Sequence, residues 1–231
     1  MLQEKPMRKI ILLTLLGLIA LLLNGCGIAG FNIGTQLNGS GNVTTESREV
    51  GSFTAIDIAG VGEVVITQGE AEGLTVETDD NLQAIVLSDV RGDTLHLGMK
   101  PDVGMNNVTR MVFNVTVKDL TQITLSGAAL VTVRDLSGDT LTVDHSGAGS
   151  ITAAGTVNEQ RVTLSGAGSY DGAGLASDRA TVDLNGLGSV VVQVRERLDA
   201  TISGAGNIEY IGSPELYQEI NGLGAIRQRA P

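Results

Sequence analysis

The sequence predicts an all-β protein, a single-chain parallel β-helix whose coils each contain about 19 residues. Two observations carry this prediction. A short phrase containing paired glycines recurs at nearly constant intervals after residue 120, and the residues around it alternate between apolar and polar. The composition agrees, because 42% of the residues are hydrophobic but only 3% are aromatic, so the core must be built from aliphatic side chains.

Six copies of the phrase, the first with a single glycine, mark the regular coils, which we expect to occupy residues 120–231. Their first glycines are separated by 20, 19, 20, 18 and 18 residues. Glycine suits a corner because it permits positive φ and close approach of another backbone. We expect a strand on each side of every corner and successive coils stacked about 4.8 Å apart. The expected corner glycines are Gly127, Gly147, Gly149, Gly166, Gly168, Gly186, Gly188, Gly204, Gly206, Gly222 and Gly224.

Two columns of residues fix the register expected for the coils. Two positions before each first glycine the residue is apolar, except that His145 replaces leucine in one copy, and three positions before it the residue is polar. Neighbouring residues of a strand point to opposite faces, so the first column is expected in a shared core and the second on the outer surface. The general preference for right-handed crossovers favours a right-handed winding. The core column is Leu125, His145, Leu164, Leu184, Ile202 and Ile220, and the outer column is Thr124, Asp144, Thr163, Asp183, Thr201 and Glu219.

Residues 51–119 are expected to form a less regular N-terminal β region of the same solenoid. No fixed period runs through most of this segment, but short stretches still alternate between apolar and polar residues, and glycines lie between several of them. The strands expected here are 63–67, 73–78, 83–87, 93–98 and 109–117.

Residues 1–25 have the features of a lipoprotein signal peptide. A basic start is followed by an apolar run over 10–23, which is short for a membrane span of about 20 residues. The run ends in Leu-Asn-Gly-Cys at 23–26, which resembles the lipobox of bacterial lipoproteins and implies lipidation of Cys26. We therefore expect export and a lipid anchor in the cell envelope, which in a Gram-negative cell means the outer membrane or the periplasmic face, with residues 26–50 as lipidated N-terminus and tether.

The charge and the residue types exclude several function classes. Removal of residues 1–25 takes away three basic residues and one acidic residue, which changes the formal charge from −11 to −13 and disfavours binding to nucleic acid. No lysine follows the glycines as a phosphate-binding loop requires. With one cysteine and two histidines, His96 and His145, we expect neither a metal site nor a cofactor.

The residues leave two functions open. One is a non-enzymatic interaction or scaffold module, with self-association through open strand edges as a further option. The other is a polysaccharide lyase or hydrolase that uses outer-face carboxylates. Its candidate residues are Asp144 and Asp183, with Arg161 or Arg179 nearby. A site made of Asp144, His145 and Ser146 is not expected, because neighbours in a strand face opposite ways.

Two stretches carry a family resemblance. The opening residues Phe53 to Ile58 (FTAIDI) and Gly62 to Gly69 (GEVVITQG), followed by the serial SGAGS and NGLGS phrases, resemble the bacterial head GIN domain, a domain labelled as an auto-transporter adhesin. The resemblance covers roughly residues 48–228. It implies an exported β-helical domain and supplies no catalytic residue. The function expected is therefore a non-enzymatic envelope lipoprotein that binds an envelope or extracellular protein or glycan.

Overall fold

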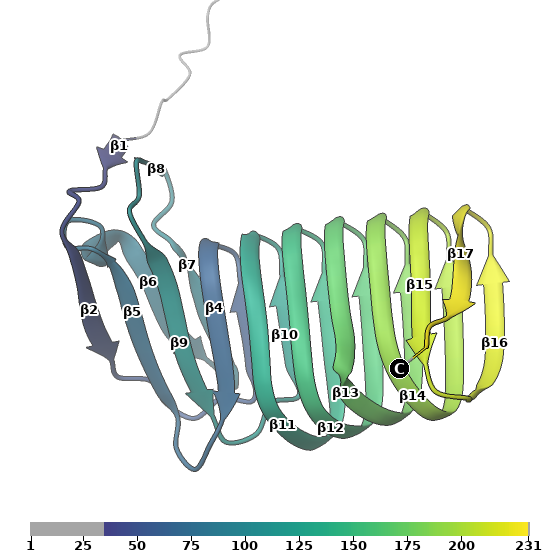
Figure 1. The fold of residues 1–231 in the computed structure, drawn as a ribbon. Helices are drawn as coiled ribbons and strands as arrows, with labels where there is room; N and C mark the ends of the chain where they lie inside the picture. The colour runs from purple at the N-terminus through teal and green to yellow at the C-terminus, as the bar shows by residue number, and fades with distance from the viewer. Residues whose placement is uncertain (1–34, 231) are drawn as a thin grey trace, which may run out of the picture. The chain divides into compact units, whose positions relative to one another are not determined.

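The computed structural model describes residues 35–230, and from Gln36 onward the chain is one compact unit. Strands dominate this part of the chain, which contains one short 3-10 helix and no α-helix (Figure 1). The expected signal peptide and Cys26 lie outside the described residues.

The regular coils form a parallel β-helix, which confirms the predicted fold class. Four long strands bend on the side of the coil opposite the glycine corners, and each pairs in parallel with the next (Figure 1). As the coils advance from the N-terminal to the C-terminal end in Figure 1, the nearer strands run down and those behind run up, so the winding is right-handed. The strands are β10 (Gln122–Leu125), β11 (Ala128–His145), β12 (Ala148–Leu164), β13 (Ala167–Leu184), β14 (Leu187–Ile202), β15 (Ala205–Ile211), β16 (Glu215–Ile220) and β17 (Leu223–Gln228).

Each coil contributes to two facing sheets. We call the stretches that lead up to each glycine corner the ascending sheet, and the stretches that lead away from it the descending sheet. Leu125, His145, Leu164, Leu184 and Ile202 are aligned strand by strand on the ascending sheet, and none is more than 1% exposed. The predicted register is therefore confirmed, and these five members of the predicted core column are buried. The sixth, Ile220, is 44% exposed, because its strand lies at the end of the sheet.

The N-terminal region begins the same solenoid and then closes it with antiparallel strands. β3 (Ala55–Ile58) pairs in parallel with β10, and β4 (Val61–Gln68) pairs with β11. The antiparallel pairs join β2 to β5, β5 to β9 and β6 to β7. Their bounds are β2 (Val43–Arg48), β5 (Gly73–Asp79), β6 (Val86–Arg91), β7 (Thr94–Met99) and β9 (Met111–Val117), while β1 (Thr35–Asn38) pairs with β8 (Val103–Asn106) in a separate sheet.

Two details of this region differ from the sequence-based expectations. Residues 83–85 form the 3-10 helix η1, and the expected strand over 83–87 begins only at Val86. The buried Gln83 side chain donates to the carbonyl oxygens of Thr44 and Val76, which holds the turn against two strands. β2 lies inside the segment 26–50 for which a tether is expected, and its residues pair with β5.

The first glycine of each corner is required by close packing of successive coils. A Cβ atom at Gly186 would overlap the carbonyl oxygen of Gly166, the equivalent residue one coil earlier. The φ of these first glycines is not positive. Among the second glycines, only Gly149 (φ 138) and Gly188 (φ 152) have a positive φ. Close approach therefore explains the first glycine, and positive φ contributes only at these two second positions.

In the regular coils, polar side chains enter the core at two places. Tyr170 replaces an aliphatic residue on the descending sheet, and its buried hydroxyl donates to Gln160 Oε1 at 2.9 Å. Gln160 Nε2 in turn donates to Ser177 Oγ at 2.9 Å and to the Leu175 carbonyl at 3.0 Å. Gly172 leaves the room that the tyrosine ring occupies, since a Cβ there would meet the ring at 2.7 Å. The second place is His145, described below.

Candidate functional site

The outer surface of the ascending sheet carries a regular row of polar residues, which we call the acidic row. Carboxylates and threonines alternate along most of it, so that like charges lie two strands apart, roughly 10 Å. This spacing limits repulsion between neighbours in the sheet. All members are half-buried except the exposed Glu219. The acidic row consists of Asp57, Thr124, Asp144, Thr163, Asp183, Thr201 and Glu219.

Neighbouring side chains extend the row at both ends. His96 Nδ1 lies 3.0 Å from Asp57 Oδ2 at the N-terminal end, where β7 pairs with β3. At the C-terminal end, Arg197 forms a two-point interaction with Asp199 and stacks 4.2 Å above the Tyr217 ring. The hydrogen bond and charge of Arg197 lower the pKa of Asp199. The acidic row is therefore a continuous polar strip that crosses several coils.

The residues considered for catalysis are not gathered around one cavity. Asp144 and Asp183 share the acidic row but are separated by Thr163. Arg161 pairs with Glu159 at 2.7 Å, and Arg179 lies 3.9 Å from a carboxylate of Glu196. A pocket beside Arg179 is lined by Asp139, Thr140, Asn158, Glu159 and Asp178, and it includes neither aspartate of the acidic row.

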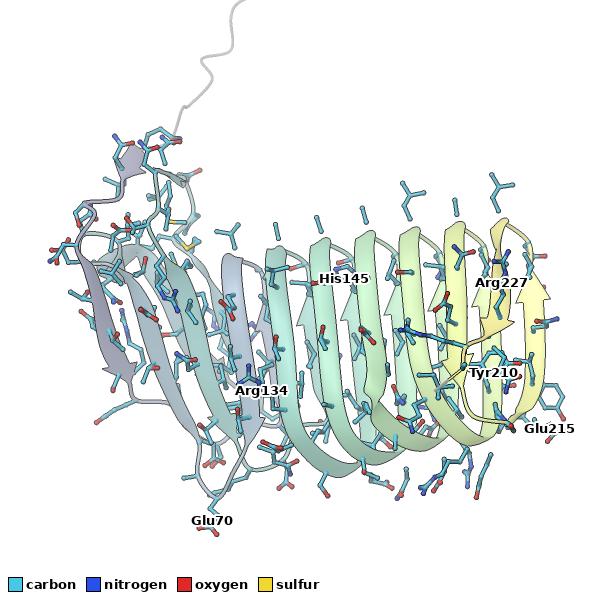
Figure 2. All side chains as sticks on the ribbon, viewed as in Figure 1. Glu70, Arg134, His145, Tyr210, Glu215 and Arg227 are labelled. Carbon is cyan, nitrogen blue, oxygen red and sulfur yellow. The ribbon has the colours of Figure 1, made fainter. Side chains whose placement is uncertain are left out.

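His145 is separated from its neighbours by the alternation of the strand. Its side chain is 1% exposed and points into the core, whereas Asp144 and Ser146 lie on the outside. Figure 2 shows its place among the coils. Neither ring nitrogen has a hydrogen-bond partner in the described structure, and burial lowers the pKa of the ring. His145, Ser146 and Asp144 therefore do not form a nucleophilic triad.

Two of the three tyrosines on the coils offer little free surface for stacking against a ligand. Tyr170 is 1% exposed, and burial raises the pKa of its hydroxyl. Tyr217 is 45% exposed but carries Arg197 on its ring, and its hydroxyl donates to Glu215 Oε1 at 2.5 Å. A sugar-stacking platform on these two rings is not present.

Sequence reasoning missed an apolar ridge along the glycine corner. The residue after the first glycine is alanine or leucine in all six copies, and these residues align with Val61. Leu187 is 62% exposed and Leu223 is 79% exposed. The alternation rule assigns faces within a strand but does not show that this position lies on the outside of a corner. The ridge consists of Val61, Ala128, Ala148, Ala167, Leu187, Ala205 and Leu223.

The described residues contain neither a candidate metal cluster nor a membrane-spanning helix. Across residues 35–230, no three His, Cys, Asp or Glu side chains lie close enough together to hold a metal ion. In the same part of the chain, no helix has the length and apolar character needed to cross a membrane.

The comparison with known families decides the classification. The family model described as "Putative auto-transporter adhesin, head GIN domain" matches residues 52–214, which is most of the chain and includes the acidic row from Asp57 to Thr201. The chain belongs to the head GIN domain family. The resemblance expected from the sequence is thereby confirmed, and the family description makes the chain an adhesion-like module of the surface or exported class.

Solved structures share the fold of this head GIN domain. A crystal structure of a "putative adhesin" from Bacteroides fragilis aligns with a TM-score of 0.70 and 22% identity, covering 84% of this chain and 100% of that one. A "putative adhesin" from Parabacteroides merdae aligns at 0.53 and 21% identity, over 84% and 99% of the two chains. A "putative lipid binding protein" from Parabacteroides distasonis aligns at 0.53 and 19% identity, over 84% and 100%. No curated protein sequence matches the chain.

Proposed function

We propose that this head GIN domain is a non-enzymatic adhesion module that binds its partner through the acidic row. The observation that carries the proposal is the alternation of carboxylate and threonine from Thr124 to Glu219 on strands of one sheet. These strands are paired on both sides as far as β14, so the side chains are held at a fixed spacing of about 4.8 Å and bind without a large ordering cost. Membership of an adhesin family supports this use.

The charge of the row favours a particular kind of partner. Asp57, Asp144, Asp183 and Glu219 supply carboxylates, and the histidine at the N-terminal end is paired with Asp57. Complementary charges steer association and set the register of an interface. The partner proposed is therefore an envelope or extracellular protein with a basic, extended surface, in preference to an anionic glycan.

A binding assay with matched charge variants tests this assignment. The chain from Gly27 onward keeps every described strand and is immobilised to capture partners from envelope extracts and extracellular matrix proteins. Asp144→Asn with Asp183→Asn should weaken capture at least tenfold and flatten its dependence on salt. The matched control is Glu63→Gln with Asp171→Asn, which removes two charges from exposed residues on the descending sheet. Equal loss of binding in both double variants would contradict a role for the acidic row.

The same protein separates the adhesion proposal from an enzyme. We expect no turnover when it is incubated with acidic and neutral polysaccharides, because the pocket beside Arg179 is lined by neither Asp144 nor Asp183. Turnover that is lost in Asp183→Asn would overturn the non-enzymatic assignment and favour hydrolysis or elimination on the ascending sheet.

The lipid anchor is the second part of the proposal. The position of the only cysteine, Cys26, directly after the apolar run supports diacylation there, and two acyl chains are sufficient for stable attachment. The full-length protein expressed in a Gram-negative host should fractionate with membranes, and Cys26→Ser should release it or leave its signal sequence uncleaved. A soluble wild-type protein whose N-terminal peptide has no lipid mass would exclude the anchor.

A further inference from the structure

The C-terminal end of the solenoid leaves its core open. Ile220 continues the column of Leu184 and Ile202, which are 0% exposed, yet Ile220 itself is 44% exposed. Leu216 and Ile226 continue two other core columns and are only half-buried. Within residues 35–230, β16 pairs only with β14 and β17 only with β15, so each presents a free edge. An edge of this kind is a template for pairing with another strand.

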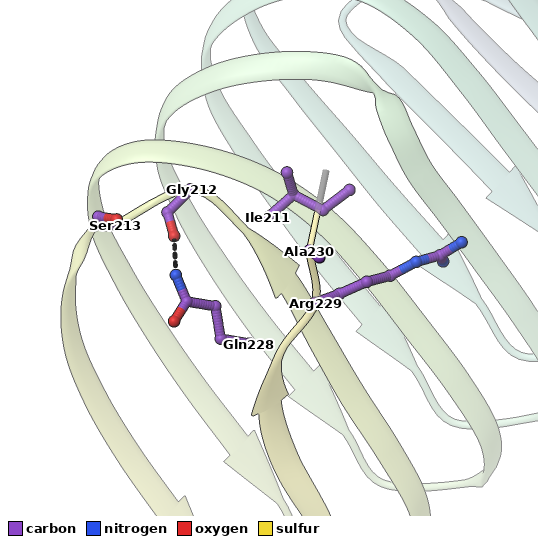
Figure 3. Close-up of a pocket in the computed structure, with 6 residues that line it drawn as sticks. All are labelled: Ile211, Gly212, Ser213, Gln228, Arg229 and Ala230. Carbon is purple, nitrogen blue, oxygen red and sulfur yellow. Dashed lines mark hydrogen bonds between the residues drawn. The ribbon is translucent and has the colours of Figure 1, made fainter.

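The last residues do not cover this end. The Arg229 amide donates to the Tyr210 carbonyl at 2.8 Å, which continues the pairing of β17 with β15. Gln228 Nε2 donates to the Gly212 carbonyl at 2.6 Å, beside a hollow lined by residues 211–213 and 228–230 (Figure 3). The tail therefore follows the strand before it and does not cross the open core.

The N-terminal end is protected on one of its two sheets. Its edge strands are β6 on the ascending sheet and β2 on the descending sheet, and the β2 residues opposite the buried Leu74 and Val76 are Arg48 and Glu46. Arg48 pairs with Glu46 at 3.0 Å and donates to the Gln83 carbonyl at 2.9 Å. Charged residues that point inward on an edge strand block pairing with another sheet. Head-to-tail stacking of copies is therefore disfavoured.

We propose that two copies of this chain join end to end through β16 and β17, related by a two-fold axis across the solenoid. Gln218 lies four residues before Gly222 on the ascending sheet, and Ile226 lies four residues after it on the descending sheet. The two residues therefore lie at the same distance from the glycine corner on the two facing sheets. A single two-fold axis perpendicular to both sheets can pass beside both of them. Around this axis β16 pairs with β16 of the second copy and β17 with its equivalent, both antiparallel, and both sheets continue across the interface.

Charge selects this register for β16. With the axis at Gln218, Leu216 faces Ile220 of the second copy in the core, and Tyr217 faces Glu219 outside. Gln218 continues the core-facing column of the buried Ala200 and faces its own copy, where the two side-chain amides can hydrogen-bond to each other. Moving the axis one residue either way places Glu219 opposite Glu215 or opposite itself, and like charges directly opposite are destabilising. An axis between two residues would place core side chains opposite outer ones. No other register with comparable overlap avoids these faults.

The register for β17 is equally free of conflict. With the axis at Ile226, this residue meets its own copy in the core, Ala225 faces Arg227, and Gly224 faces Gln228. The half-buried Ile226 and Leu216 would then be enclosed as the equivalent residues of earlier coils are. The partner proposed is a second copy of this chain, because its two edges lie level with those of the first copy and can pair with both sheets at once.

Mass and cross-linking test the dimer. The chain from Gly27 onward lacks Cys26, so Gln218→Cys would be its single cysteine. We expect the unmodified protein to have the mass of a dimer by sedimentation equilibrium. Gln218→Cys and, separately, Ile226→Cys should form disulfide-linked dimers under mild oxidation, because directly opposite residues in antiparallel strands have Cα atoms about 4.5–5.5 Å apart. Ser189→Cys, an exposed residue two coils from the end, should not cross-link.

Gln218→Lys tests the interface in the opposite way, by weakening the dimer. The Gln218 side chain is exposed and makes no hydrogen bond in the described structure, so the monomer should fold normally, which circular dichroism would verify. Two lysines on the axis should raise the dimer dissociation constant at least tenfold, whereas Ser189→Lys should leave it unchanged. A monomeric parent protein, or cross-linking of Ser189→Cys as fast as Gln218→Cys, would overturn the proposal. Larger, concentration-dependent assemblies would favour head-to-tail stacking and also refute it.

Discussion

Replacement of His145 by leucine should stabilise the solenoid. The imidazole lies between Leu125 and Leu164 in the core column, and all three side chains are 0–1% exposed. Neither ring nitrogen has a hydrogen-bond partner. An unsatisfied buried polar group costs about 1–3 kcal/mol, so the removal of two such groups should raise the free energy of unfolding by about 2 kcal/mol or more. For a domain of this size that corresponds to a rise in Tm of about 4–8 °C.

The pH dependence gives a sharper measurement of the same substitution. Burial lowers the pKa of His145 in the folded state below its ordinary value of 6.5. The unfolded chain then binds more protons than the folded one, so stability falls as the pH drops below about 6.5 and levels off below the folded pKa. In this window the wild type should lose up to about 1.4 kcal/mol per pH unit relative to His145→Leu.

Urea denaturation followed by circular dichroism, at about pH 7.5 and about pH 5.5, measures both effects. Carboxylates titrate in both proteins, so the difference between the two curves isolates His145. The reasoning is refuted if His145→Leu is less stable than the wild type at the higher pH, or if the difference between the two proteins does not grow on acidification.

Three further substitutions test the packing of the coils. Gly186→Val should prevent cooperative melting, because any Cβ there overlaps a carbonyl oxygen of the preceding coil. Its control, Leu187→Val at an exposed position, should change the free energy of unfolding by about 0.5 kcal/mol or less. Equal melting temperatures of the two variants would contradict the close approach of the coils at Gly186. Leu184→Asp should unfold the array, since it places an unpaired charge in the core, and a wild-type melting curve would show the register to be wrong. Tyr170→Phe should cost about 1–3 kcal/mol in chemical denaturation, because Gln160 loses its donor, and no loss would mean that the hydroxyl is dispensable.

The regular coils could be predicted because their register follows from a short sequence repeat. A glycine every 18–20 residues aligns Leu164 with Leu184 without knowledge of any distant contact. The N-terminal region could not be predicted to the same degree. β2 and β5 meet through an antiparallel pair that joins Val43 to Asp79, and no periodicity links these residues. Long-range pairing of this kind depends on packing and leaves no local signal.

The candidate site divides in the same way. The acidic row follows from alternation alone, and so does the pairing of Arg161 with Glu159, because residues two apart in a strand share a face. The open C-terminal end of the solenoid could be recognised only from the structure. Ile220 obeys the core pattern as closely as Leu184 does, and only the position of β16 at the end of the sheet exposes it.

The glycine corner also explains why a binding surface would lie beside it. Coil lengths vary between 18 and 20 residues, and the register shifts that absorb this variation lie on the far side of the coil, between Val133 and Leu136 and between Thr152 and Ala154. Close contact between backbones at the glycines leaves no room for an inserted residue. Asp144 and its neighbours in the acidic row lie three residues before the first glycine and therefore stay in strict register from coil to coil. Insertions elsewhere in the coil can change its length without altering the spacing between the side chains of the acidic row that a partner would contact.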